Sequence, residues 1–401
     1  MTWIKRLGQA PRELKLFAYA SLAMGVAYSI FDSTFNNFLN ERYELNAFQR
    51  SFLEFPRELP GVLVVFVSAM LWFLCSRRLG VLSLLLGFAG TLLIGFFAPT
   101  YAIMLFFLFI YSLGQHLFMP IASAIGMELA EEGRTGQRLG QLNAIRNLAA
   151  IGGSFLVFLG FNYLRFTFQH AFVLVAVGLG IAALLMSAMK PEENSRPGLF
   201  LKLHKEYRLF YLLNVLSGSR KQIFITFAPW VIVTIFNQPT QTIATLMTIG
   251  GIIGILFQPF LGRMIDRLGE RFVLAAEAVL LVGVCLGYGF SKFVLSADVA
   301  FIAVCVFYLL DQMLFSVSMA RSMYIKKIAI RPEDVQPALT AGVTIDHVFS
   351  ITVALIGGVI WNAFGFQYVF LLGVFIAILN FFVVLQIRIP QRDAEHEIAR
   401  G

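Results

Sequence analysis

Charged side chains interrupt stretches of the sequence that are otherwise apolar, and their types allow proton transfer and ion pairing. Carboxylates and histidines can take up and release protons, whereas lysine and arginine attract anionic groups. These residues are Asp32, Glu54, Arg57, Glu58, His116, Arg146, Arg220, Lys221, Glu277, Asp311, Arg321, Asp346 and His347. A charge at the centre of a bilayer costs about 2.5–3.5 kcal/mol, so in a membrane each must face a partner or a water-filled cavity.

Helical spacing gathers several of these residues onto polar faces. In an α-helix, residues three and four positions apart lie on one face. The faces comprise Tyr28, Asp32, Asn36 and Asn40; Ser112, His116 and Ser123; Asn143, Arg146 and Asn147; Asn214, Ser217 and Lys221; and Tyr308, Asp311 and Gln312. This pattern predicts helices that turn polar sides toward a shared interior.

Two of these residues have a structural explanation as well as a functional one. Asp32 is either a neutralising partner of Lys221 or Arg220, or a group that binds solute or protons. His116 is either a hydrogen-bonding partner of Ser112 or part of the same binding site. The sequence leaves both alternatives open.

Other embedded charges are interpreted one by one. Arg146 pairs with a carboxylate or binds solute, and Glu277 is expected at a contact between helices. Asp346 and His347 are neighbours in the chain, and neighbours on a helix point about 100° apart, so they need not touch each other.

The elements that carry these charges are long and apolar. Of the 401 residues, 58 % are hydrophobic and only 13 % are charged, against about 25 % in soluble globular chains. Stretches near the 20 residues that span a bilayer cover 15–40, 51–75, 79–98, 101–127, 137–164, 168–189, 207–236, 240–262, 270–290, 297–325, 333–363 and 367–388. The sequence predicts an all-α integral membrane protein with twelve such helices, because it lacks the alternation of a membrane β-barrel.

Basic residues predict the orientation. With a cytoplasmic N-terminus, the inner segments hold 22 of the 31 Lys and Arg residues, and the outer loops hold four: Arg42, Arg50, Arg165 and Lys292. This bias predicts that both termini face the cytoplasm, in the cytoplasmic membrane. The net charge of +8 therefore reflects topology, and no nucleic-acid partner is predicted.

Cysteine spacing indicates neither a metal site nor a disulfide framework. Cys75, Cys285 and Cys305 lie far apart in apolar stretches, without a Cys-x-x-Cys or Cys/His pattern. We predict buried free thiols, no metal and no cofactor.

The sequence indicates two related halves. We predict a six-helix bundle over 1–189, a cytoplasmic linker over 190–206, a second bundle over 207–390 and a cytoplasmic tail over 391–401. Phe168-Gln169 opens the sixth stretch and Phe366-Gln367 opens the twelfth, while Gly152-Gly153 recurs as Gly357-Gly358. Matches in the same order near half the chain length indicate a pseudo-symmetric duplication.

This organisation resembles the major facilitator superfamily. Residues 262–271 fit the superfamily's G-x-x-x-D-R-x-G-x-R loop, in which Asp266 would accept from helix N-termini and Arg263 and Arg267 would latch the cytoplasmic side. The corresponding loop after the second stretch has Arg77 where the family has its acid, and the subfamily is not identified.

The resemblance also implies positions for a site and a gate. The first, fourth, seventh and tenth helices would line a central cavity, and the second, fifth, eighth and eleventh would form the moving interface between halves. The candidate residues for substrate binding and coupling are Tyr28, Asp32, Asn36, Gln115, His116, Arg146, Arg220, Lys221, Tyr308, Asp311, Gln312, Asp346 and His347. The gating candidates are Glu54, Arg57 and Glu58 near the outer mouth, with Asp266 and Arg267.

These features predict a monomeric secondary transporter in a lipid bilayer. It would move a small anionic or zwitterionic solute by alternating access, coupled to protons or another ion through Asp32, Asp311, Asp346 and either His116 or His347. The alternative is an exporter or flippase of amphiphilic drugs or lipids. An enzyme is disfavoured because the chain lacks a Walker loop, G-x-S-x-G and H-E-x-x-H.

Overall fold

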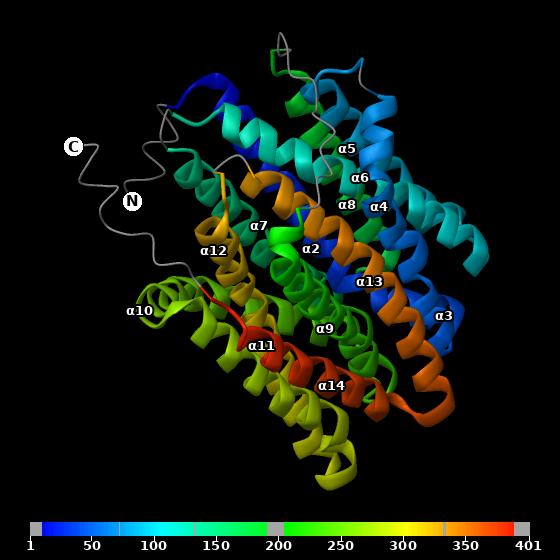
Figure 1. Cartoon of the computed structure of the whole chain (residues 1–401). Helices are drawn as coiled ribbons and strands as arrows, with labels where there is room; N and C mark the ends of the chain where they lie inside the picture. Colours follow the sequence, from blue (N-terminus) through cyan, green and yellow to red (C-terminus); the bar gives the residue numbers. More distant parts are fainter. Residues whose placement is uncertain (1–9, 72, 132–133, 191–203, 332–333, 389–401) are drawn as a thin grey trace.

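The computed structural model describes residues 10–71, 73–131, 134–190, 204–331 and 334–388, which contain helices and no strand. The helices are α2 (Arg12–Tyr43), α3 (Ala47–Phe52), α4 (Glu54–Met70), α5 (Ser76–Phe97), α6 (Tyr101–Glu128), α7 (Thr135–Tyr163), α8 (Phe168–Ser187), η1 (Lys205–Tyr207), α9 (Arg208–Thr234), α10 (Thr240–Val294), α11 (Ala297–Leu314), η2 (Phe315–Val317), α12 (Ser318–Ile328), α13 (Val335–Phe364) and α14 (Phe366–Val384) (Figure 1). The predicted tail over 391–401 and most of the predicted linker over 190–206 lie outside the described residues.

Nine of the helices in the described residues are long and apolar enough to cross a membrane, so the chain is a multi-pass membrane protein. The other two long helices are exceptions for identifiable reasons: α4 has only 17 residues, and α9 carries Arg220 and Lys221 near its middle. Because α4 and α9 do not meet the length and composition limits, the prediction of twelve spanning helices stays a prediction.

The long helix α10 consists of two helices that meet at Gly269. This residue has φ 80° and ψ 161°, a conformation with positive φ that favours glycine and breaks the helical hydrogen-bond pattern. Gly365, with φ 109°, separates α13 from α14 in the same way. At the start of α3, Asn46 and Gln49 form a reciprocal capping box that fixes where the helix begins.

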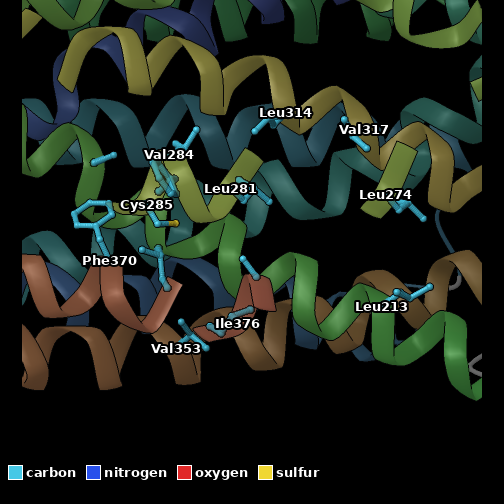
Figure 2. Packing of buried hydrophobic residues seen from close by; sticks show 14 of the residues in the cluster. Leu213, Leu274, Leu281, Val284, Cys285, Leu314, Val317, Val353, Phe370 and Ile376 are labelled. Atoms are coloured by element: carbon cyan, nitrogen blue, oxygen red, sulfur yellow. The ribbon is translucent and has the colours of Figure 1, made fainter. Parts of the chain in front are cut away.

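The buried apolar residues form two clusters. One is drawn from residues 17–189 together with Trp230 and Ala244, and the other from residues 207–387. Figure 2 shows the second cluster, in which Leu213 of α9, Leu281 of α10, Leu314 of α11 and Phe370 of α14 come from well-separated parts of the chain. The clusters fall on either side of the predicted linker, although the bundle boundaries stay predictions.

We call α2–α8 the first helix set and α9–α14 the second. In the first set, α2 packs on α7 and α8, and α5 packs on α6 and α8; in the second, α10 packs on α11 and α14, and α9 packs on α13 and α14. In the view of Figure 1, α5, α6 and α8 lie on one side of the molecule and α10, α11 and α14 on the other. The helices α2, α7, α9 and α13 lie between them.

We call the end of the helix array at which α2 begins the near end, and the end at which α2 finishes the far end. At the near end, Arg12 at the start of α2 donates to the carbonyl oxygen of Ala188, just beyond α8. At the far end, the Tyr43 hydroxyl at the end of α2 donates to the carbonyl oxygen of Ala98 at 2.7 Å. The chain therefore crosses the array repeatedly between these two ends.

The two helix sets contact each other at the middle and the far end. The Asn37 side chain donates to the carbonyl oxygen of Gln238 at 2.9 Å, and the hydroxyls of Ser154 and Thr248 share a hydrogen bond of 2.9 Å. Within the described part of the chain, the hydrogen bonds and ion pairs found between the two sets lie in these regions. The sets are thus joined at the middle and the far end of the helix array.

Candidate functional site

A cavity of about 350 Å³ lies between the two helix sets, at mid-height. Its walls come from α2, α4, α9, α10 and α11. The predicted residues that line it are Asp32, Asn36, Arg57, Lys221, Tyr308, Asp311 and Gln312. We call this the central cavity. Three of the predicted polar faces, those of Asp32, Lys221 and Asp311, contribute to its lining, whereas the faces of His116 and Arg146 do not.

Asp32 faces the central cavity and is loosely held. Its carboxylate lies 3.9 Å from the Arg57 guanidinium, and its side chain is 45 % exposed. Arg57 lies 3.6 Å from Glu54 as well, so it divides its charge between two carboxylates. The structure therefore pairs Asp32 with Arg57, and the alternative of a partnership with Lys221 or Arg220 is wrong.

Arg220 lies at the centre of a buried ionic network beside the cavity. Its guanidinium donates to Asp311 of α11 and lies 3.4 Å from Glu277 of α10, which lies 3.4 Å from Arg321 of α12. The side chains of Arg220, Asp311 and Glu277 are each at most 3 % exposed. Two cations and two anions balance here, as buried charges require, and Glu277 lies at a helix contact as predicted.

Lys221 and Asp346 form a partly exposed ion pair. The Lys221 Nζ is 2.7 Å from the Asp346 carboxylate, and the lysine side chain is 33 % exposed. A second cavity of about 300 Å³, between α9, α12 and α13, shares Lys221 and Phe315 with the central cavity. Lys221 can therefore meet a solute from either cavity.

His116, His347 and Glu58 form a separate group. The Glu58 carboxylate accepts a 2.7 Å hydrogen bond from the His347 Nδ1, and the two imidazole rings lie 4.8 Å apart between centroids. The His116 Nδ1 also lies 2.9 Å from the Ser112 carbonyl oxygen, as one of the two alternatives predicted. The neighbours Asp346 and His347 do point to different partners.

Arg50 belongs to a buried ion pair that the sequence analysis did not predict. We predicted it in an outer loop, but the capping box of α3 starts a helix there and turns Arg50 inward, where it is 0 % exposed. It pairs with Glu54 at 2.7 Å, and Gln222 of α9 donates to the same carboxylate at 3.1 Å. The four-residue spacing of Arg50 and Glu54 was a usable signal; nothing in the sequence pointed to Gln222.

Several predicted site residues lie elsewhere. The Arg146 side chain donates to Asn143 on its own helix and has no carboxylate partner among the described residues. Tyr28 packs edge-on against Tyr111, with 6.3 Å between ring centroids. Neither Tyr28, Arg146 nor Gln115 lines the central cavity. A larger hollow of about 670 Å³ at the far end, between α2, α5 and α8, contains none of the predicted site residues.

The predicted latch residues lie at the near end, where none of the described hydrogen bonds or ion pairs that they form joins the two helix sets. Arg77 donates to the Glu128 carboxylate and to the carbonyl oxygen of Lys190, and all three residues belong to the first set or follow it directly. Asp266 and Arg267 are exposed, and neither makes a hydrogen bond or ion pair within the described part of the chain. The latch role of these two residues stays a prediction.

A glycine permits the close approach of α13 to α3. A Cβ at Gly358 would overlap the Ser51 side chain and lie 3.2 Å from the Cα of Phe48. We expect Gly358→Val to lower the free energy of unfolding by about 1–3 kcal/mol, as overpacking does, measured by denaturation in detergent. Gly254→Val is the matched control because nothing lies within 4 Å of a Cβ there. Equal losses in both variants would contradict the close packing.

Comparisons with known proteins agree with this geometry. The family model described as Major Facilitator Superfamily matches residues 59–320 and 210–400. No curated protein matches the chain. Similar solved structures include the nucleoside transporter NupG (TM-score 0.72, 12 % identity, covering 94 % of this chain and 100 % of that chain) and a D-xylose-proton symporter (TM-score 0.69, 14 %, 95 % and 98 %). A POT family transporter in complex with a thioalcohol conjugated peptide is also similar (TM-score 0.70, 12 %, 94 % and 95 %).

Proposed function

The chain belongs to the Major Facilitator Superfamily and is a transporter rather than an enzyme, and we propose that it moves a small zwitterionic or anionic organic solute by proton-coupled alternating access. The observation that carries this proposal is the central cavity, which is enclosed by both helix sets and lined by charges of both signs. Its volume of about 350 Å³ suits a small organic molecule.

The charges of the cavity favour a zwitterion. Asp32 is the most exposed of the ion-paired acids along the cavity and is only loosely paired, so it can bind an ammonium group. Lys221 and Arg57 lie among the same lining residues and can bind a carboxylate, for which the planar guanidinium of arginine is well suited. Phe35, Phe224 and other apolar side chains complete the lining and would hold the rest of the solute.

Proton coupling is proposed through the carboxylates that hold the cations in place. Protonation of Asp311 would weaken its bond to Arg220, and protonation of Asp346 would release Lys221 toward the cavity. Asp32 can exchange protons directly because it faces the cavity. One transporter with a similar fold is a D-xylose-proton symporter, which supports the same form of energy coupling here.

Alternating access is proposed to begin from a conformation that is closed at the far end. The buried Arg50, Glu54 and Gln222 link the two helix sets on that side. A further hollow of about 390 Å³ between α7, α10 and α12 lies toward the near end. The positive-inside rule assigns the near end to the cytoplasm, so this conformation would face inward, in a monomer of the cytoplasmic membrane.

The substrate class can be tested by ligand-dependent stability. Binding to the folded state raises the unfolding temperature of the purified protein in detergent. The probes are amino acids, dipeptides, nucleosides and organic anions, with lysolipids and hydrophobic cations for the alternative of an amphiphile exporter or flippase. Stabilisation by zwitterions or anions supports the proposal, whereas stabilisation by amphiphiles alone favours the alternative.

We expect Asp311→Asn to abolish accumulation of the solute driven by a pH gradient, because asparagine cannot carry the proton. Exchange of labelled for unlabelled solute should continue, since exchange needs no net proton movement. Both are measured in proteoliposomes. Asp298→Asn, at an exposed position in the first turn of α11, is the control. Gradient-driven accumulation that is unchanged in both Asp311→Asn and Asp32→Asn would contradict the coupling assignment.

A further inference from the structure

Three side chains of metal-ligand type converge where the helix sets meet. Glu58 comes from α4, His116 from α6 and His347 from α13, and one ligand atom of each lies within 4.8 Å of the other two. All three side chains are largely buried. They lie on three different helices far apart in the sequence, so the spacing of ligands along the chain could not reveal them.

Hydrogen bonds fix the orientation of His116. The Ser112 hydroxyl donates to the carbonyl oxygen of Arg57, and the His116 Nδ1 lies 2.9 Å from the carbonyl oxygen of Ser112 and 3.0 Å from its hydroxyl oxygen. A carbonyl oxygen only accepts, so Nδ1 carries the proton and Nε2 keeps a free lone pair. Histidines that bind metals are commonly held in this way by a backbone carbonyl.

The backbone leaves room for both rings. A Cβ at Gly61 would lie 2.7 Å from the His347 ring and 2.8 Å from the His116 ring, so the absence of a side chain there lets the imidazoles meet. On the other side, the Glu58 carboxylate lies 2.7 Å from the His347 Nδ1. The nearest cation along the chain, Arg57, is directed to Glu54 and Asp32.

We propose that Glu58, His116 and His347 form a binding site for a divalent transition metal of the zinc class. Two imidazole nitrogens and one carboxylate oxygen are a ligand set that Zn²⁺ accepts, with the fourth position open to water. The metal would lie about 2.0–2.2 Å from each ligand atom, so the three ligand atoms, which now lie within 4.8 Å of one another, would move closer together on binding. Magnesium is a poor candidate because it prefers oxygen ligands alone.

The site joins the two helix sets. Glu58 and His116 belong to the first set and His347 to the second, so a bound metal would hold this conformation together. Its effect on transport rests on the proposed alternating access, since a bridge between the sets slows any cycle that separates them. Metal binding itself does not depend on that proposal, so binding is measured on purified protein, apart from transport.

The test uses the full-length protein, purified in detergent without a histidine tag and treated with a chelator. We expect saturable binding of one Zn²⁺ per chain by titration calorimetry, a rise in unfolding temperature with Zn²⁺, and no rise with Mg²⁺. His116→Gln and His347→Gln should each weaken binding at least about tenfold, since even the loss of a group that merely orients a metal ligand has an effect of that size. His204→Gln, at a histidine just before η1, is the control.

Two results overturn the proposal. One is equal Zn²⁺ affinity of the unaltered protein and the His116→Gln/His347→Gln variant; the other is no saturable binding by the unaltered protein. Should a variant fail to fold, Co²⁺ bound to the unaltered protein decides instead, because its visible absorption reports ligand type and coordination number. Nitrogen ligands in a four-coordinate site support the proposal, and an all-oxygen six-coordinate site overturns it.

Discussion

Replacing Arg220 with methionine is expected to destabilise the fold by about 3–5 kcal/mol, the cost of removing one partner from a buried ion pair. Arg220 donates to Asp311 and lies 3.4 Å from Glu277. Methionine fills much of the same space but leaves two buried carboxylates opposed only by Arg321. The free energy of unfolding is measured by titrating a denaturing detergent into the detergent-purified protein.

The matched control is Arg267→Met, because Arg267 is exposed on α10 and pairs with none of the described residues. Its effect should stay within about 0.5 kcal/mol. Adding Asp311→Asn to Arg220→Met should recover part of the loss, since it removes one of the unopposed charges. If Arg220→Met leaves the free energy of unfolding unchanged, the buried ionic network does not stabilise the fold in the way predicted here.

Replacing Glu54 with glutamine is expected to open the far end. The Glu54 carboxylate lies 2.7 Å from Arg50 and 3.6 Å from Arg57, and it accepts from Gln222 of the second helix set. Without it, Arg50 is buried without a counter-ion, which costs about 3–5 kcal/mol in this conformation. Opening would let water reach Arg50, so the equilibrium should shift by about 100-fold or more toward the open form.

This shift can be measured by labelling a cysteine in the central cavity. The native Cys75, Cys285 and Cys305 are first replaced by serine, and Ile225→Cys is introduced on the cavity wall. An impermeant maleimide added from the far side of oriented proteoliposomes should react faster when Glu54→Gln is present. Glu41→Gln, at an exposed position near the end of α2, is the control. Equal labelling rates in all variants would argue against a far-end gate.

The sequence was sufficient to predict that the chain is all-helical and which charges are embedded in its apolar stretches, because hydropathy and helical spacing are local properties. Asp32, Lys221 and Asp311 line one cavity, as the polar faces of their helices suggested. A membrane helix carries a charge only where it finds a partner or water, so the charges of these three residues marked the inward sides of their helices.

Partners could not be predicted, because they depend on how each helix is rotated against its neighbours. Asp32 pairs with Arg57 rather than with Lys221 or Arg220, and a rotation of α2 by one residue, about 100°, would have changed that choice. Asp346 and His347 illustrate the same point, since adjacent positions on α13 have different partners: Asp346 pairs with Lys221, and His347 forms a hydrogen bond with Glu58.

Arg50 was missed for a different reason. Hydropathy assigns a charged residue beside an apolar stretch to a loop, so Arg50 was predicted in a loop. The capping box that starts the helix containing Arg50 consists of two polar residues, Asn46 and Gln49, which hydropathy does not detect. The pairing of Glu58 with His116 and His347 was invisible because it joins three helices of two different sets. Both features require tertiary information.

The hydrogen bonds of Arg77 bear on which contacts would have to break in the proposed transport cycle. Its bonds to Glu128 and to the Lys190 carbonyl oxygen stay within the first helix set and the residue that follows it. Under the proposed alternating access, none of them would have to break when the near end opens. The bond that would have to break is the one that Gln222 of α9 donates to Glu54, the carboxylate that Arg50 also holds, at the far end. If the proposed cycle holds, we therefore expect the activation barrier for turnover to lie at the far end, so that substitutions there change the rate of transport most.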